Sequence, residues 1–168
     1  MAQIRLMQPQ DIPAGLELCR LAGWNQLEAD WRRLLELEPQ GLFVADEAGR
    51  VAGTASTTSY DCRTAWIGMV LVHPDFRRQG IGSALMTRCI ETLRARGIQS
   101  IKLDATDQGR PVYLKLGFHD ERADCRYAGT VPGGLTASPL ARPLQSSDWP
   151  GVLALDEEAF GADRRRLL

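Results

Sequence analysis

The chain has 168 residues, enough for one domain with a hydrophobic core and a short extension. Apolar residues make up 44% of it and charged residues 24%, a composition that excludes an intrinsically disordered chain. Lys plus Arg number 20 and Asp plus Glu 21, so no global field would recruit nucleic acid or an anionic membrane. The sequence shows neither a secretory signal nor an apolar run of membrane-spanning length, and we expect a cytoplasmic protein.

The first sixty residues predict a strand, two helices and a hairpin. Residues 3–7 alternate apolar and polar side chains, as strands do, and Asp11 is the expected N-cap of a helix that ends near Leu21. Apolar residues recur at helical spacing over residues 27–38, which predicts a second helix. Residues 42–60 contain two β-prone runs joined by a short polar segment, a pattern typical of a β-hairpin.

The next seventy residues predict alternating strands and helices. The run 65–72 is almost wholly apolar, so we expect a strand covered on both faces at the centre of the sheet. Residues 81–96 carry a continuous apolar stripe at helical spacing. A strand at 98–105, a short helix at 109–116 and a final strand at 118–128 follow. The order β-α-α-β-β-β-α-β-α-β indicates an α/β (α+β) fold.

The C-terminal part of the sequence resembles its N-terminal start. Residues 130–141 are rich in Pro, Gly, Ser and Thr, which indicates a linker. At an offset of 137 residues, six positions of the start recur in one register: Arg5, Gln8, Asp11, Pro13, Leu16 and Leu18 match Arg142, Gln145, Asp148, Pro150, Leu153 and Leu155. We interpret residues 142–168 as the start of a second, truncated domain of the same kind, with chance similarity as the alternative.

An isolated strand and helix cannot bury their own apolar face. We therefore expect Leu153, Leu155 and Phe160 to dock on the body of the protein or on another copy of the chain. Docking on another copy would give a homodimer.

A glycine-containing loop separates the apolar strand from the long helix, and its residues are Arg77, Arg78, Gln79, Gly80, Ile81, Gly82 and Ser83. At a helix N-terminus the main-chain N–H groups point outward, and glycines let a pyrophosphate approach them. The helix dipole and the two arginines add a positive field. A nucleoside-triphosphatase loop would need Gly-Lys followed by Ser or Thr, and a dinucleotide fingerprint would need a third glycine where Leu85 stands.

With these residues the segment 66–118 resembles the GNAT-type N-acetyltransferase superfamily. The signature of that family is Gln or Arg, two residues, Gly, one residue, and then Gly or Ala. Arg77, Gly80 and Gly82 match this signature, with the apolar strand before it and Tyr113 at a suitable distance after it.

The resemblance implies an acetyl-CoA-binding domain at residues 1–129. Its mixed, mostly antiparallel central sheet would have splayed central strands and flanking helices. The pantetheine arm would contact the strand end, and the pyrophosphate would lie in the loop. Thr106 stands where the family often has asparagine. The cofactor residues implied are Val70, Leu71, Val72, Arg77, Arg78, Gln79, Gly80, Ile81, Gly82, Ser83, Thr106, Gly109 and Tyr113.

The resemblance also implies a catalytic role for Tyr113, which falls on the family's tyrosine near the cofactor sulfur. The ordinary pKa of a tyrosine is about 10 and that of a thiol about 8.5, so Tyr113 can stay protonated and donate to a departing thiolate. The alternative is a helix tyrosine with its ring in the core and its hydroxyl in water.

Fewer residues in the sequence point to the binding site of the acceptor amine and to a catalytic base. In this family the first two helices and their connection choose the acceptor, and here the connection contains Trp24, Asn25 and Gln26, an aromatic face beside two amides. Many relatives carry a catalytic carboxylate on the strand that here reads Trp-Ile-Gly-Met, and none is present. Asp61 and Asp104 are the alternative bases, or water could relay the proton. Strand N–H groups could steady the oxyanion.

Metal chemistry finds no support in the sequence. The cysteines lack the close pairing of zinc or redox sites, and we expect buried, reduced thiols: Cys19, Cys62, Cys89 and Cys125. The two histidines, His73 and His119, have no ligand companions.

Two functions of different classes follow. The first is an acetyltransferase that acts on a primary amine of a small molecule or peptide by direct attack in a ternary complex. The second is a module that binds acetyl-CoA as a sensor or scaffold without turnover. Tyr113 favours the enzyme, and the missing strand carboxylate favours the module.

Overall fold

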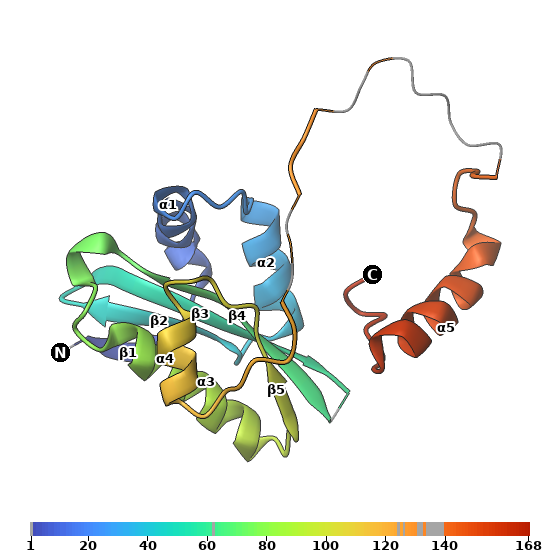
Figure 1. Ribbon diagram of the computed structural model, residues 1–168. Coiled ribbons are helices and arrows are strands. Elements are labelled where there is room, and N and C mark those ends of the chain that lie inside the picture. The colour runs from blue at the N-terminus through green and yellow to red at the C-terminus, as the bar shows by residue number, and fades with distance from the viewer. Residues whose placement is uncertain (1, 62, 124, 126, 131–132, 134–139) are drawn as a thin grey trace.

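The computed structural model describes residues 2–61, 63–123, 125, 127–130, 133 and 140–168. Five strands form one sheet in the order β1-β2-β3-β4-β5 (Figure 1). The strands are β1 (Gln3–Leu6), β2 (Leu42–Glu47), β3 (Arg50–Tyr60), β4 (Thr64–Val72) and β5 (Ser100–Lys102). The helices are α1 (Ile12–Leu21), α2 (Glu28–Leu37), α3 (Ile81–Ala95), α4 (Arg110–Lys115) and α5 (Trp149–Phe160). Short 3-10 turns are η1 (Pro9–Asp11), η2 (Pro74–Phe76) and η3 (Ser146–Asp148).

The sheet is mixed and mostly antiparallel, which confirms the predicted fold class. The first four strands pair antiparallel with their neighbours, and only β4 and β5 pair in parallel. The prediction that β4 is the central strand is wrong, because β3 lies in the middle. Buried polar residues hide the central position of β3 in the sequence. The hydroxyl of Thr54 donates to the carbonyl of Met69, and that of Thr57 donates to the carbonyl of Gly41.

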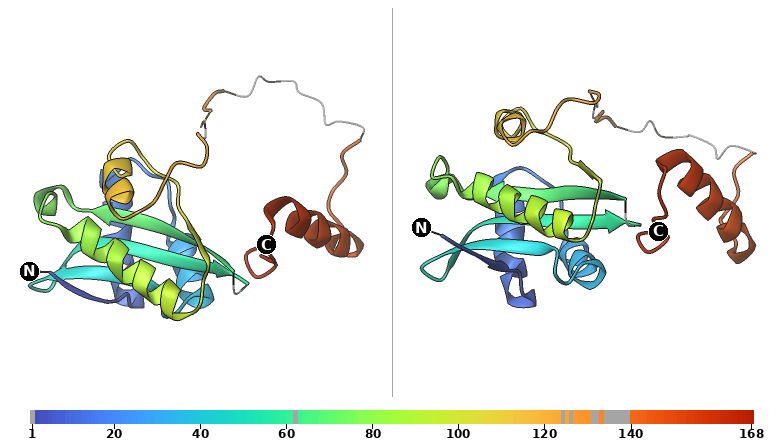
Figure 2. Two further views of the ribbon diagram at one scale, coloured as in Figure 1. Left: turned by 60° about the horizontal axis from the view of Figure 1, so that its bottom comes forward. Right: turned by 90° about the horizontal axis from the view of Figure 1, so that it is seen from below.

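Two apolar clusters cover the two faces of the sheet, with α3 on one side and α1 and α2 on the other (Figure 2). The predicted stripe of α3 is confirmed, since six of its residues are buried: Ile81, Leu85, Met86, Cys89, Ile90 and Leu93. These six residues and the buried sheet residues on which they pack, among them Ile67 of β4, form what we call the α3-side cluster. Removing each large apolar side chain from water contributes roughly 1.5–3 kcal/mol, so the stripe fixes α3 on the sheet. The α1-side cluster contains Met7, Ile12, Leu18, Trp31, Leu42, Val44 and Leu71.

The helix start at Asp11 differs in detail from the prediction. Asp11 is the N-cap residue of α1, but its side chain makes no capping bond to that helix. The carboxylate instead accepts the main-chain N–H of Gln8 at 2.8 Å and two guanidinium bonds from Arg5. It therefore closes the turn η1 that leads into α1.

The segment after α4 is the largest departure from the predicted fold. No strand is present among the described residues of the range 118–128, so the predicted final strand is wrong, and β5 is shorter than predicted. Charged side chains give the reason. Asp120 and Glu121 form ion pairs with Arg110 and Lys102 instead of packing into a ladder.

The C-terminal part contains η3 and α5, while most of the predicted linker, residues 131–132 and 134–139, lies outside the described residues. Residues 140–145 are not a strand, so only the helical half of the predicted repeat has formed. Phe160 packs edge-on against Tyr60, with ring centroids 5.0 Å apart, and near Trp66 at 5.8 Å, which bears out docking of this side chain on the body.

Three cysteines can be located. Cys19 and Cys89 are buried free thiols as predicted, Cys125 is exposed against the prediction, and Cys62 lies outside the described residues. Within the described part of the chain, no three His, Cys, Asp or Glu side chains gather as a metal site would require. Each helix among the described residues is too short or too polar to cross a bilayer.

Candidate active site

The candidate site begins where β4 and β5 separate. Their pairing ends at Trp66 opposite Lys102, whereas β4 continues to Val72. In the part of the chain that the structure describes, residues 67–72 therefore have no strand partner on the side that faces β5. Main-chain N–H and C=O groups along such an edge are open to an extended ligand.

A β-bulge lies in the middle of this open edge. Ile67 packs in the α3-side cluster and Leu71 in the α1-side cluster, although residues four apart in a regular strand face the same side. The register with β3 shifts at this point, and Met69 has a φ of 50°. The Thr54 hydroxyl holds the Met69 carbonyl at 2.8 Å. The bulge thus re-aims the main chain of β4 within its unpaired stretch.

The N-terminus of α3 lies beside the end of β4. Gly80 is the N-cap residue in the left-handed region, with a φ of 80°, a conformation that favours glycine. The first helical bond runs from the Ala84 N–H to the Gly80 carbonyl, so the N–H groups of residues 81–83 have no acceptor within the helix. A Cβ at Gly82 would lie 3.7 Å from Val72 Cγ2, which shows how closely the helix start approaches the strand.

Side chains of the preceding loop support this helix start. The Nε of Arg77 donates to the Val72 carbonyl at 3.1 Å, and the amide nitrogen of Gln79 donates to the Asp75 carbonyl at 3.2 Å. Arg77 and Arg78 are both exposed, and they come directly before the helix start whose N–H groups point outward. This combination of helix terminus, glycines and arginines is suited to an anion such as a diphosphate.

Tyr113 on α4 lies over Gly109. A Cβ at Gly109 would come within 2.8–2.9 Å of the tyrosine ring and hydroxyl, so this ring position requires glycine there. The ring packs against the α3-side cluster, and its centroid lies 6.3 Å from that of Phe118. Burial raises the pKa of Tyr113 above its ordinary value, which keeps the hydroxyl protonated at neutral pH. Thr106 accepts the Gly109 N–H at 3.2 Å and so caps the turn before α4.

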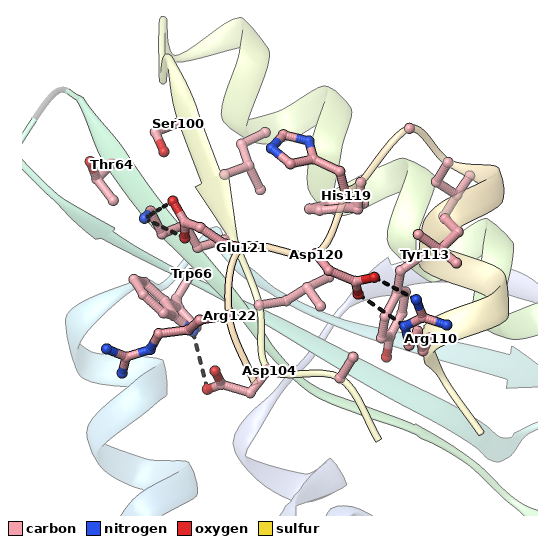
Figure 3. Close-up of a pocket in the computed structure, with 18 of the residues that line it drawn as sticks. Thr64, Trp66, Ser100, Asp104, Arg110, Tyr113, His119, Asp120, Glu121 and Arg122 are labelled. Atoms are coloured by element: carbon pink, nitrogen blue, oxygen red, sulfur yellow. Dashed lines mark hydrogen bonds and ion pairs between the residues drawn. The ribbon is translucent and has the colours of Figure 1, made fainter. Parts of the chain in front are cut away.

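An open cleft of about 1410 Å³ runs along β5 toward Tyr113 (Figure 3). Ion pairs cross it from the segment after α4, between Lys102 and Glu121 and between Arg110 and Asp120. Residues 66, 102 and 121 were not predicted as parts of a site. Trp66 and Lys102 become neighbours only through the pairing of β4 with β5, in which they are register partners, and the Lys102 ammonium lies 6.0 Å from the centroid of the Trp66 ring.

The residues predicted for the acceptor occupy three different environments. Trp24 packs against the α1-side cluster, whereas Asn25 is exposed. The side-chain oxygen of Gln26 is buried and has no hydrogen-bond partner among the described residues. The two alternative bases are engaged elsewhere, because Asp61 accepts the Asp163 N–H at 3.1 Å and Asp104 accepts the indole N–H of Trp66 at 3.3 Å.

The structure combines a bulged, unpaired edge of β4 with a glycine-capped helix start beside it. This is the arrangement of the class of acyl-transferring α/β proteins that the sequence resembles. The pattern of the Acetyltransferase (GNAT) family matches residues 12–118, and the chain belongs to this family. The chain is 33% identical over 130 residues to acetyltransferase ECA0875 of Pectobacterium atrosepticum, a match that covers 73% of the chain and 90% of the relative.

Two longer proteins match almost the whole chain. The uncharacterized N-acetyltransferase YitH of Bacillus subtilis is 27% identical over 155 residues, which cover 91% of the chain but 54% of YitH. A crystal structure of a candidate acetyltransferase from Pyrococcus horikoshii matches with a TM-score of 0.73 and 26% identity, over 98% of the chain and 59% of that protein. The chain therefore spans a little more than half the length of each.

Proposed function

We propose that the protein is a cytoplasmic N-acetyltransferase that transfers acetyl from acetyl-CoA to a primary amine of a small molecule or peptide. The observation that carries the proposal is the start of α3, where Gly80 in the left-handed region caps a helix directly beside the open edge of β4. Membership of the GNAT family supports acetyl transfer in general.

The residues of the loop fit a coenzyme A diphosphate. Nothing lies within 4 Å of a Cβ built on Gly80, so an anion has room to approach the N–H groups at the helix start. We assign residues 70–72, 77–83, Thr106, Gly109 and Tyr113 to the cofactor. The open main chain at 70–72 would bind the pantetheine amides as an added strand would be bound.

Acetyl-CoA would supply an activated acetyl thioester, and the protein would supply position and charge. In direct attack, the C–N bond to the amine forms and the C–S bond breaks within one ternary complex. Main-chain N–H groups at the bulged edge of β4 would stabilise the oxyanion of the tetrahedral species. Tyr113 would hold a proton for the leaving thiolate, because its raised pKa keeps it protonated.

The amine must lose a proton during the reaction, and we propose that water accepts it. The described part of β4 carries no carboxylate, and Asp61 and Asp104 already hold hydrogen bonds. For the acceptor we propose the connection between α1 and α2, residues 24–26. The side-chain oxygen of Gln26 has no hydrogen-bond partner among the described residues, and because this oxygen is buried, the connection would have to open before it could accept an amine N–H.

Tyr113→Phe tests the catalytic role. We expect kcat for thiol release with a reactive amine to fall on the order of 10²-fold while affinity for acetyl-CoA stays within about twofold, since the phenol acts on the leaving group. Gly109→Ala should push the ring aside and lower kcat in the same direction. The matched control is Tyr127→Phe, because Tyr127 is almost fully exposed. An unchanged kcat in Tyr113→Phe would contradict the catalytic role assigned to Tyr113.

The same assay distinguishes the second function. If coenzyme A binds but no amine in a broad panel releases thiol, the protein is a non-catalytic acetyl-CoA-binding module. The absence of a carboxylate from β4 is the observation that favours this reading. A homodimer joined through the C-terminal tail stays a prediction.

A further inference from the structure

The second copy of the sequence repeat folds locally like the first. In each copy, an arginine binds an aspartate six residues later, at 2.7 Å between Arg5 and Asp11 and at 2.6–2.7 Å between Arg142 and Asp148. The main-chain N–H three residues before each aspartate donates to it at 2.8 Å. A 3-10 turn and then a helix follow in both. We call this arrangement the helix-start motif.

The two copies differ in what covers their apolar side chains. The first copy buries three of them at 2%, 2% and 3% exposure: Met7, Ile12 and Leu18. The residues at the same three positions of the second copy are exposed by 55%, 39% and 67%: Leu144, Trp149 and Leu155. A motif that is built to bury one face therefore has that face open in the second copy.

The cover of the first copy is an apolar sheet face. Met7, Ile12 and Leu18 share one cluster with Leu42 and Val44 of β2 and Leu71 of β4, together with Trp31. The sheet of the body cannot serve the second copy in the same way, because helices already cover both of its faces (Figure 2).

The second copy does touch the body, but through other residues. Phe160, at the end of α5, packs on Tyr60 and Trp66, and the Asp163 N–H donates to Asp61. One position of the motif has also changed: Asp156 replaces the buried Cys19 and accepts bonds from Arg164. Docking through the end of α5 leaves the face of Leu144, Trp149 and Leu155 available.

We propose that this face docks on the apolar face of a second β-sheet, which belongs to a second GNAT-type unit in the same polypeptide beyond residue 168. The occupant follows from the first copy, where the same positions meet a sheet of that kind. Two relatives that match nearly the whole chain are longer, since the match covers only 54% of one and 59% of the other. The proposal does not depend on the acceptor or on catalysis.

The test compares two lengths of the protein: residues 1–168 and the whole product of the natural reading frame. Leu155→Ser is the variant, and Leu27→Ser is the matched control because Leu27 is also 67% exposed. In residues 1–168 both changes should leave the melting temperature within about 2 °C of wild type. In the longer protein, Leu155→Ser should lower the transition of the C-terminal unit by about 5 °C or more, and Leu27→Ser should not.

Three results would overturn the proposal. The reading frame could end at residue 168, or Leu155→Ser could match Leu27→Ser in the longer protein. The third is a concentration-dependent dimer of residues 1–168 in sedimentation that Leu155→Ser abolishes, which would make a second copy of the chain the occupant.

Discussion

The two helix-start motifs have the same hydrogen bonds in different surroundings. Around Asp11 the motif lies on a sheet, and the carboxylate is 6% exposed. Around Asp148 it lies away from the sheet, and the carboxylate is 23% exposed. The guanidinium partner lowers the pKa of both aspartates, and the main-chain N–H adds to this effect. Local bonds alone therefore form the turn, whereas burial of the following helix requires a sheet.

The largest expected effect comes from the apolar side chain that the two motifs share. In residues 1–168, Leu18→Ser should lower the free energy of unfolding by about 3 kcal/mol or more, because it opens a cavity and buries a hydroxyl. Leu155→Ser should change it by less than about 0.5 kcal/mol, since Leu155 is exposed. Urea unfolding measures both. Equal losses of unfolding free energy would contradict the comparison, because the apolar face that includes Leu155 would then be covered within the 168 residues.

A smaller difference is expected for the aspartates. Asp11→Asn should lower the free energy of unfolding by about 2 kcal/mol, the range for hydrogen bonds to a charged group. Asp148→Asn should leave the urea midpoint of the body unchanged, because an exposed pair is screened by water and salt.

The pH dependence of folding stability should distinguish Asp11 from Asp148 as well. Because the folded pKa of Asp11 is lowered, its contribution to stability is present above its unfolded pKa of about 3.9 and is lost as pH falls through the folded value. Asp11→Asn should therefore flatten the acid limb of stability below about pH 4, and Asp148→Asn should keep the wild-type limb. A wild-type acid limb in Asp11→Asn would show that other carboxylates govern acid unfolding.

Features set by local sequence could be predicted. The stripe of α3 follows from helical spacing, and the loop at residues 77–83 follows from glycines at a helix start. The role of Tyr113, in contrast, was expected only through the family resemblance and stays a prediction. The predicted final strand was wrong because a strand depends on pairing between distant segments. Residues 118–128 have strand-like signals, but their charged side chains form ion pairs instead.

The bulge at Met69 could likewise not be predicted from the sequence. It arises from the register between β3 and β4 and from the Thr54 hydroxyl that holds the Met69 carbonyl. A run of apolar residues in β4 predicts a buried strand, but it does not say which main-chain groups remain without a partner. The opening between β4 and β5 was therefore expected only through the family resemblance, and it is confirmed by where their pairing ends.

The most direct test of the function is calorimetric titration of coenzyme A into Gly82→Asp and its isosteric control, Gly82→Asn. A side chain at this position has room, and an aspartate in the first turn favours the helix, so the free protein should keep its stability. A carboxylate about 4 Å from a diphosphate costs about 1–4 kcal/mol. We predict that Gly82→Asp binds coenzyme A at least about tenfold more weakly than Gly82→Asn. Equal affinities, or a wild-type protein that does not bind coenzyme A, would contradict the assignment of this helix start to the cofactor.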